Sequence, residues 1–407
     1  MNIPMPTENR QRLVWVDALR FAAIFLVILS HSCDPLTANP DPAVSSDPSL
    51  GFWGACWQSL TRPSVPLFVC MTGLLLLPVR EDMFTFWSRR CRRVLWPFLI
   101  WSVLYCLYPV IGMGLGMAPE TVTRCFVEVE TPSPALCDAL QNIARIPFDF
   151  TPYAVHMWYI FLVLGLYLYL PVFSAWVAKA TRREKLAVLG IWFLSLFLPY
   201  AAIVTPQCLG TCAWNHFGML YYFAGFSGYL LLGHLISTAP APSFRRALGI
   251  GLPLIIIGYA ITLIGFRITQ TLPQDAADWE LGRLICHACS PTAIAAPYTE
   301  LHETCLMYCS PNVALMTLGV LLIFRSLPAA RFSPALQAAL RNLTACGLGI
   351  YLVHYLIIGP ANILVQNAKV PIPLQVPLSA IITIAVVWPC VALLRRLLRR
   401  HAAIVLG

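Results

Sequence analysis

The stretch Val14–Ser32 reads VWVDALRFAAIFLVILSHS, and it decides the fold class. It is apolar and close to the ~20 residues that a helix needs to cross a bilayer. Arg20 and His31 are eleven positions apart, close to three turns at ~100° per residue, so both project from one face, about 16 Å apart. Asp17 can neutralise Arg20 along the same helix. Ionisable groups inside a span are costly, so this polar stripe is a candidate functional site.

The rest of the chain is similarly apolar. Of its 407 residues, 58% are hydrophobic and 11% are charged, whereas soluble chains average about 25% charged residues. Mean hydropathy is +0.72. The apolar runs are too long for barrel strands, so we predict a single all-α, polytopic membrane domain over residues 1–407, with no appended soluble domain. The net charge of +9 comes from basic residues at span ends and does not indicate a nucleic-acid partner.

Ten transmembrane helices are predicted from the apolar runs. They cover Val14–Ser32, Val65–Val79, Val94–Gly116, Val155–Ala178, Leu186–Val204, Phe217–Ile236, Leu248–Ile268, Leu306–Phe324, Ala345–Val365 and Val376–Leu398. Arginine and lysine gather in the even-numbered connections and after the last span, so the positive-inside rule predicts that both termini are cytoplasmic. His31 then lies at the outer end of the first span, and Arg20 lies nearer the middle or the inner half.

The cysteines are concentrated on the predicted outer side. Ten of the fifteen lie in or beside the outer connections: Cys33, Cys56, Cys125, Cys137, Cys208, Cys212, Cys286, Cys289, Cys305 and Cys309. An oxidising exterior favours disulfides. The spacings Cys286-x-x-Cys289 and Cys305-x-x-x-Cys309 also suit zinc. Disulfides are favoured over zinc, and the further alternative is that some of these cysteines are free thiols packed at the membrane surface; no metal cofactor is expected.

Short motifs recur along almost the whole chain. They are Val16-Asp17-Ala18-Leu19-Arg20-Phe21 with Ser30-His31, then Pro66-Leu67-Phe68-Val69-Cys70-Met71-Thr72-Gly73, Arg90-Cys91-Arg92-Arg93-Val94-Leu95-Trp96-Pro97-Phe98, His156-Met157-Trp158-Tyr159 and Gly349-Ile350-Tyr351-Leu352-Val353-His354. In this order they resemble the integral-membrane acyltransferase-3 family, which includes bacterial O-acetyltransferases that modify surface polysaccharides. The resemblance implies an acyl-CoA co-substrate, a glycan or lipid-linked saccharide acceptor, and a multi-pass protein of the bacterial inner membrane.

The first span carries the residues most suited to catalysis. A hydroxyl that attacks a thioester needs a base near neutral pH, and imidazole is the usual one. His31 fits that role; the alternative is a helix-end histidine bonded to a carbonyl or a lipid head group. Arg20 could hold His31 indirectly, bind an acyl carbonyl or pair a phosphate, or it could form only a structural ion pair. Asp17 is then a supporting residue.

Two arginines near the start of the third span are candidates for donor binding. Arg90 and Arg93 are one turn apart, and guanidinium groups at the positive end of a helix attract phosphate. Coenzyme A carries several phosphates and is cytoplasmic, so we predict that this pair binds acyl-CoA. Basic residues at this place also satisfy the positive-inside rule alone.

The candidate acceptor residues come from the fourth and ninth spans. His156, Trp158 and Tyr159 are predicted at the outer mouth of the fourth span, either as a saccharide-facing surface or as an interfacial aromatic belt. His354 lies deep in the ninth span. It is either a substrate-binding residue or a core histidine bonded to another helix.

Together with these residues, the resemblance to the acyltransferase-3 family implies an O-acyltransferase. It would move an acyl group, with acetyl favoured, from cytoplasmic acyl-CoA to a hydroxyl of a surface or lipid-linked glycan, among membrane lipids. The alternative is a transporter or flippase for a polar lipid or solute, because polar stripes inside spans also line permeation paths. The matched halves of many transporters are not evident in the sequence. A third possibility is a receptor-like or structural membrane protein without chemistry.

Overall fold

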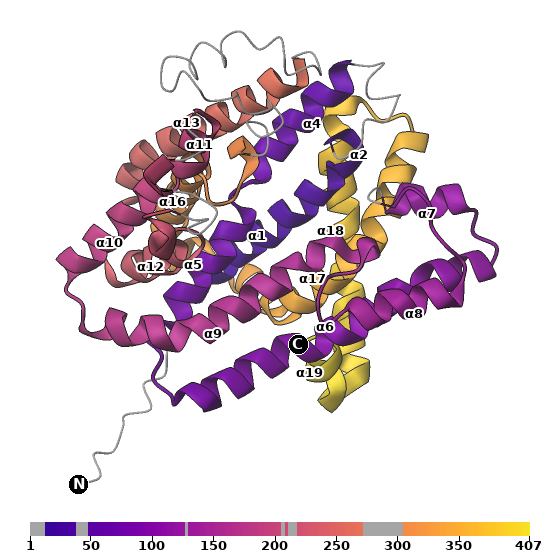
Figure 1. The fold of residues 1–407 in the computed structure, drawn as a ribbon, viewed down its shortest axis with the longest axis horizontal. Helices are drawn as coiled ribbons and strands as arrows, with labels where there is room; N and C mark the ends of the chain where they lie inside the picture. Colours follow the sequence, from indigo (N-terminus) through magenta and orange to yellow (C-terminus); the bar gives the residue numbers. More distant parts are fainter. Residues whose placement is uncertain (1–12, 38–47, 127–128, 205–207, 211–217, 272–303) are drawn as a thin grey trace.

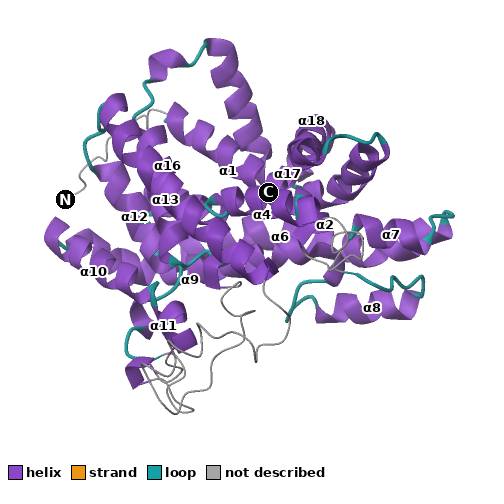
Figure 2. Ribbon diagram, turned by 90° about the horizontal axis from the view of Figure 1, so that it is seen from above, coloured by secondary structure: helices purple, strands orange, loops and turns teal. Residues whose placement is uncertain are grey.

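The structure is a computed structural model that describes residues 13–37, 48–126, 129–204, 208–210, 218–271 and 304–407. Within these ranges the chain is a bundle of helices without β-strands (Figures 1 and 2), which confirms the predicted fold class. Nine helical segments of this described part are long and apolar enough to cross a membrane. The protein is therefore a polytopic membrane protein.

Helix α1 (Val14–Ser32) runs through the middle of the bundle (Figure 1). It packs against α4 (Pro48–Thr61), α5 (Ser64–Leu76), α17 (Pro334–Asn367) and α18 (Ile372–Leu398). Enclosure by four helices explains why α1 is apolar on nearly every face, as buried helices are. Asp17 is buried in this packing, whereas Arg20 and His31 are partly exposed.

Two hydrophobic cores meet along α1. Trp15 and Leu19 belong to one core, whereas Ile24 and Ile28 belong to the other. Arg20 lies between the two groups along the helix, and His31 lies between Leu29 and Cys33, which belong to the second core. The polar stripe predicted from the sequence is thus set between packed apolar layers.

The remaining helices surround this centre. Their bounds are α2 (Asp34–Thr37), α6 (Met83–Gly114), α7 (Pro119–Cys125), α8 (Leu136–Arg145), α9 (Trp158–Lys179), α10 (Arg182–Ser195), α11 (Leu198–Val204), α12 (Ser227–Thr238), α13 (Phe244–Thr271), α16 (Pro311–Arg325) and α19 (Ala402–Val405). The closest pairings outside α1 are α13 with α16, α17 with α18, and α5 with α12.

The second predicted span starts too late. The sequence assigns residues 33–63 to an outer connection, whereas the structure forms α2 and α4 there. Together α4 and α5 make one candidate span over Ser49–Leu76, interrupted between Thr61 and Ser64. The glycine, serine and glutamine of α4 dilute its hydropathy, and its helix is held by packing against α1 and α13.

The arginine run before the third span is helical rather than a loop. Helix α6 begins at Met83, well before the predicted start at Val94. Asp82 caps it by accepting hydrogen bonds from the backbone N–H groups of Phe84 (3.2 Å) and Thr85 (2.8 Å). Bonding to Thr85 and Phe84 also lowers the pKa of the Asp82 carboxyl. Since arginine is a good helix former, the cap is enough to extend the helix through the run.

The predicted sixth span is shortened to α12, which has 12 residues. At 1.5 Å per residue this is about 18 Å, less than the ~30 Å hydrocarbon core. Gly225, with φ of +82°, and the short 3₁₀ turn Tyr221–Phe223 interrupt the helix on its N-terminal side. The apolar sequence of this region does not reveal the interruption.

Helix α12 instead makes a very close contact with α5. A Cβ atom on Gly73 would lie 2.0 Å from the Leu230 carbonyl oxygen, and one on Gly233 would lie 1.9 Å from the Cys70 carbonyl oxygen. Small residues allow such backbone approach in membrane bundles. Gly73, which ends one of the sequence motifs, therefore has a packing role.

Candidate active site

Three histidines from distant parts of the chain meet near the end of α1. His31 lies in its last turn, His156 lies in the 3₁₀ turn Pro152–Met157 before α9, and His354 lies within α17. The ring centroids are 4.9 Å apart for His156 and His354, 5.6 Å for His31 and His354, and 6.2 Å for His31 and His156. His156 and His354 are 1% and 0% exposed. The three predicted histidines thus form one cluster in which His156 and His354 are buried and His31 is partly exposed, and His156 lies inside the protein rather than at an interface.

Asp34, which the sequence analysis missed, orients His31. Its Oδ2 atom accepts a hydrogen bond from Nδ1 of His31 at 3.0 Å, with the side chains 21% (His31) and 14% (Asp34) exposed. An ionised carboxylate only accepts hydrogen bonds, so Nδ1 of neutral His31 carries the proton and Nε2 keeps its lone pair. The three-residue spacing across the end of α1 is the signal that could have identified this pair.

The other two histidines have buried nitrogens without partners. Nδ1 of His354 donates to the carbonyl oxygen of Tyr351 at 2.6 Å, so its Nε2 holds a lone pair. That Nε2, and both ring nitrogens of His156, have no hydrogen-bond partner in the described structure. Buried polar groups are nearly always hydrogen-bonded in proteins. The cluster is therefore suited to a polar ligand.

Aromatic side chains hold the cluster together. The Tyr355 ring packs against His31 at 5.3 Å and His156 at 4.8 Å, measured between centroids. The Tyr351 hydroxyl donates a hydrogen bond to the carbonyl oxygen of His156. The Tyr105 hydroxyl donates to the Leu352 carbonyl oxygen at 2.8 Å. These contacts fasten the His156 turn and α6 to α17, and the sequence analysis singled out none of the three tyrosines as a site residue.

Arg20 lies along α1 about 16 Å from His31 by helix rise. Its charge acts on the hydroxyls of Tyr159 and Tyr167, both on α9. The Tyr159 ring packs against Tyr351 at 5.9 Å, and Tyr351 in turn contacts the histidines. Tyrosines therefore link the region of Arg20 with the cluster.

Tyr351, Tyr159 and Tyr167 form a row of tyrosines that continues toward α6. Arg90 and Arg93 both act electrostatically on Tyr167. The Arg90 guanidinium lies over the Phe86 ring at 5.9 Å, and its buried Nε atom has no partner in the described residues. The two arginines predicted for donor binding thus lie at the opposite end of a tyrosine row from the histidines.

Asp17 has a supporting position. Its carboxylate accepts a hydrogen bond from the Thr344 hydroxyl at 2.9 Å, and Asp17 is 6% exposed. This contact ties α1 to α17.

Trp158 lies apart from the ring contacts of the histidine cluster. It stacks on Tyr308, with centroids 5.6 Å apart and planes 20° apart. Tyr159, by contrast, contacts both Tyr351 and Phe68. Of the two aromatic residues predicted to face the acceptor, Tyr159 is the one next to a residue of the cluster.

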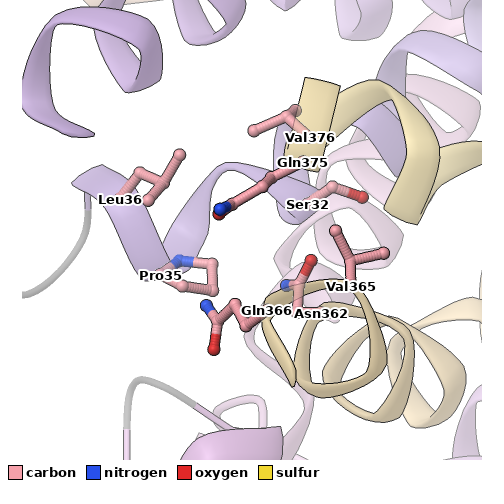
Figure 3. Close-up of a pocket in the computed structure, with 8 residues that line it drawn as sticks. All are labelled: Ser32, Pro35, Leu36, Asn362, Val365, Gln366, Gln375 and Val376. Carbon is pink, nitrogen blue, oxygen red and sulfur yellow. The ribbon is translucent and has the colours of Figure 1, made fainter. Parts of the chain in front are cut away.

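A small cavity lined by both polar and apolar side chains lies beside the end of α1 (Figure 3). Its free volume is about 10 Å³, the minimum for one water molecule. The amides of Asn362, Gln366 and Gln375 surround this space (Figure 3). Ser32 and Pro35, which also line it, are the chain neighbours of His31 and Asp34. The cavity thus has room for one water molecule next to the chain segment that carries the Asp34–His31 pair.

The described residues contain neither a candidate metal site nor a disulfide bond. No group of three or more histidine, cysteine or acidic residues there could hold a metal ion. Six of the predicted outer cysteines are free thiols in the structure: Cys33, Cys56, Cys125, Cys137, Cys305 and Cys309. The side chains of the other four lie outside the described residues.

The fold and the site define a polytopic membrane protein whose helical bundle holds an aspartate-bonded histidine next to two buried histidines. A family model described as an acyltransferase domain, of the acyltransferase-3 type, matches residues 13–394. The chain therefore belongs to the acyltransferase-3 family, as its motifs suggest. No curated protein and no solved structure matches the chain significantly.

Proposed function

We propose that the protein is an O-acyltransferase that moves an acyl group, with acetyl favoured, from cytoplasmic acyl-CoA to a hydroxyl of a surface or lipid-linked glycan. The observation that carries this proposal is the Asp34–His31 pair, which leaves an unprotonated Nε2 on His31 beside two buried histidines. The family match supports acyl transfer as the reaction. The transporter alternative has no comparable support.

The proposed reaction starts with proton transfer to His31. Its Nε2 atom takes the proton of the acceptor hydroxyl while the oxygen attacks the thioester carbonyl carbon. Collapse of the tetrahedral intermediate breaks the carbon–sulfur bond, and the imidazolium returns the proton to the departing thiolate. The Asp34 carboxylate stabilises the imidazolium and holds the ring in the reactive tautomer.

The two buried histidines have complementary parts in this proposal. The lone pair on Nε2 of His354 can accept a hydrogen bond from a second hydroxyl of the saccharide, next to the one that reacts, and so orient the acceptor. His156 has both ring nitrogens available, so its N–H can donate to the oxyanion that develops on the thioester carbonyl. Such donors are most effective in a buried site because few solvent molecules screen them.

The donor is proposed to enter from the end of the molecule that holds Arg90 and Arg93. The positive-inside rule supports a cytoplasmic position for this arginine run and for both termini. An extended pantetheine arm from phosphates at Arg90 and Arg93 would follow the row Tyr167, Tyr159 and Tyr351 toward His31. In a bacterium, this topology corresponds to the inner membrane with the glycan acceptor on the outer side.

The first test is donor binding. Binding to the native state raises stability by about 2.7 kcal/mol at a ligand concentration of 100 Kd. We expect acetyl-CoA to raise the melting temperature of the detergent-purified protein, and Arg90→Ala/Arg93→Ala to lose the shift. Arg245→Ala/Arg246→Ala, another basic pair, is the control and should keep it. No shift with acetyl-, succinyl- or longer acyl-CoA would favour the transporter alternative.

The second test is chemistry. His31→Ala should keep the acetyl-CoA shift but lose release of free coenzyme A. A His31→Ala variant that folds and turns over acetyl-CoA like the wild type would refute the role of His31 as the base.

A further inference from the structure

Arg62 is a buried cation that the proposed reaction does not use. It lies between α4 and α5, inside a candidate membrane span, and is 8% exposed. Nε donates to the Gln58 carbonyl oxygen at 3.3 Å, Nη1 to the Leu306 carbonyl oxygen at 3.3 Å, and Nη2 to the Ser30 hydroxyl at 3.4 Å. Its guanidinium carbon is 5.3 Å from the centroid of the Tyr308 ring.

Within the described ranges, these contacts leave the charge of Arg62 without a compensating carboxylate. No carboxylate in the described part of the chain lies within ion-pair distance of it. Buried arginines are rare unless they are paired with an anion. Moreover, the three contacts are 3.3–3.4 Å long, whereas charge-assisted hydrogen bonds are typically about 2.7–2.9 Å. The guanidinium therefore has capacity for a stronger, anionic partner.

Arg62 also borders the candidate active site. Its partner Ser30 directly precedes His31 in α1. Arg62 and Asp34 both lie near Cys33, close enough for their charges to act on its thiol. Asp34 is already engaged by His31 at 3.0 Å. Once His31 takes up a proton, Asp34 balances it and the charge of Arg62 remains.

We propose that Arg62 binds an anionic group of the acceptor, a phosphate or a carboxylate close to the hydroxyl that is acylated. This inference rests on the proposed function. A planar guanidinium suits both anions because it donates two parallel hydrogen bonds. The acceptor is thus an acidic saccharide or a saccharide phosphate, and Arg62 selects it over neutral sugars. The competing explanation is structural, with Arg62 only tying α4 to α1 and to the Leu306 segment.

The experiment measures anion binding without acyl-CoA. The melting temperature of the full-length protein is followed against inorganic phosphate, glucose 1-phosphate, glucuronate and glucose. All titrations use the Arg90→Ala/Arg93→Ala background, which removes the other candidate phosphate site. In this background we compare Arg62, Arg62→Gln and Arg62→Lys. Arg124→Gln is the matched control, because Arg124 is an exposed arginine that bonds the side chain of Gln366.

We expect a shift with glucose 1-phosphate or glucuronate, but not with glucose, and an affinity at least tenfold weaker in Arg62→Gln. The stronger of the two anions identifies phosphate or carboxylate as the recognised group. Arg124→Gln should bind like the parent. An equal shift in the parent and Arg62→Gln would mean an adventitious ion only, and no shift with any anion would also overturn the proposal.

Two further measurements separate loss of anion binding at Arg62 from misfolding of the variant and from failure of the proposed function. If Arg62→Gln fails to fold, Arg62→Lys decides: at least threefold weaker binding is expected because the two-pronged geometry is lost, and unchanged affinity would overturn the proposal. In the wild-type background, Arg62→Gln should keep the acetyl-CoA shift. If the wild type itself shows no acetyl-CoA shift, the proposed function fails, whereas the anion titrations still report on Arg62.

Discussion

Replacing Asp34 by asparagine tests the tautomer of His31. In the structure the carboxylate accepts the Nδ1 proton at 3.0 Å, which leaves Nε2 as the base. An asparagine amide can instead donate to Nδ1, and this would move the proton to Nε2 and remove the lone pair that takes the acceptor proton. Asp34→Asn should therefore be more harmful than Asp34→Ala, in which water can accept the Nδ1 proton.

The size of the effect follows from burial. General acid–base groups contribute about 10²- to 10⁴-fold to rates, and the equivalent change in a serine-protease triad costs about 10⁴-fold. His31 and Asp34 are 21% and 14% exposed, so solvent replaces part of the lost interaction. We expect turnover to fall about 10²- to 10³-fold in Asp34→Asn, or roughly 2.7–4.1 kcal/mol in barrier height, and about tenfold in Asp34→Ala.

The assay is release of free coenzyme A by the purified protein, with water as the acceptor where no glycan is supplied. Asp149→Asn is the control, because Asp149 is an exposed carboxylate that bonds the Phe150 amide. The acetyl-CoA melting shift should be unchanged in all variants, which separates catalysis from donor binding. Near-normal turnover in Asp34→Asn, or a larger loss in Asp34→Ala than in Asp34→Asn, would refute the tautomer argument.

Three other substitutions test the cluster and the packing. His354→Leu removes the unpartnered lone pair and should lower coenzyme A release about ten- to a hundredfold, whereas His401→Leu, at an exposed position, should not change it. Gly233→Ala should destabilise the fold by about 1–3 kcal/mol in a reversible unfolding assay, because its Cβ would meet backbone 1.9 Å away. Gly249→Ala, with open space around it, should not destabilise. Thr344→Val should lower stability by about 0.6–2 kcal/mol without changing turnover per folded molecule, since it breaks the bond to the buried carboxylate on α1.

The sequence predicted the features that depend on local hydropathy. α1 was predicted with the residue bounds that the structure has, because a continuous apolar run with a polar stripe is readable from one segment. The second and sixth predicted spans were wrong in extent, since α4 is held by tertiary contacts and α12 is interrupted at Gly225. The start of α6 depends on the cap at Asp82, which a hydropathy argument overlooks.

The sequence indicated many of the candidate site residues, but it did not indicate how these residues are arranged in space. His31, His156 and His354 were each identified, yet nothing in their spacing indicates that His156 and His354 come within 4.9 Å of each other. Asp34 was readable from its three-residue spacing to His31 and was missed because it follows the end of the apolar run. Arg62 was missed because it was assigned to an outer connection.

The position of α1 explains why one partner of His31 is close in sequence and the others are distant. A helix that packs against four others can carry Arg20 and His31 at low cost only if neighbouring elements supply polar partners, because ionisable groups inside a membrane span are costly. The partner that fixes the His31 tautomer is local, since Asp34 lies on the next short helix. The groups beside its reactive nitrogen come from the turn before α9 and from α17, which are brought in only by folding. The proton-accepting group is thus set by a few consecutive residues, whereas the surroundings that would choose its substrate depend on the whole bundle.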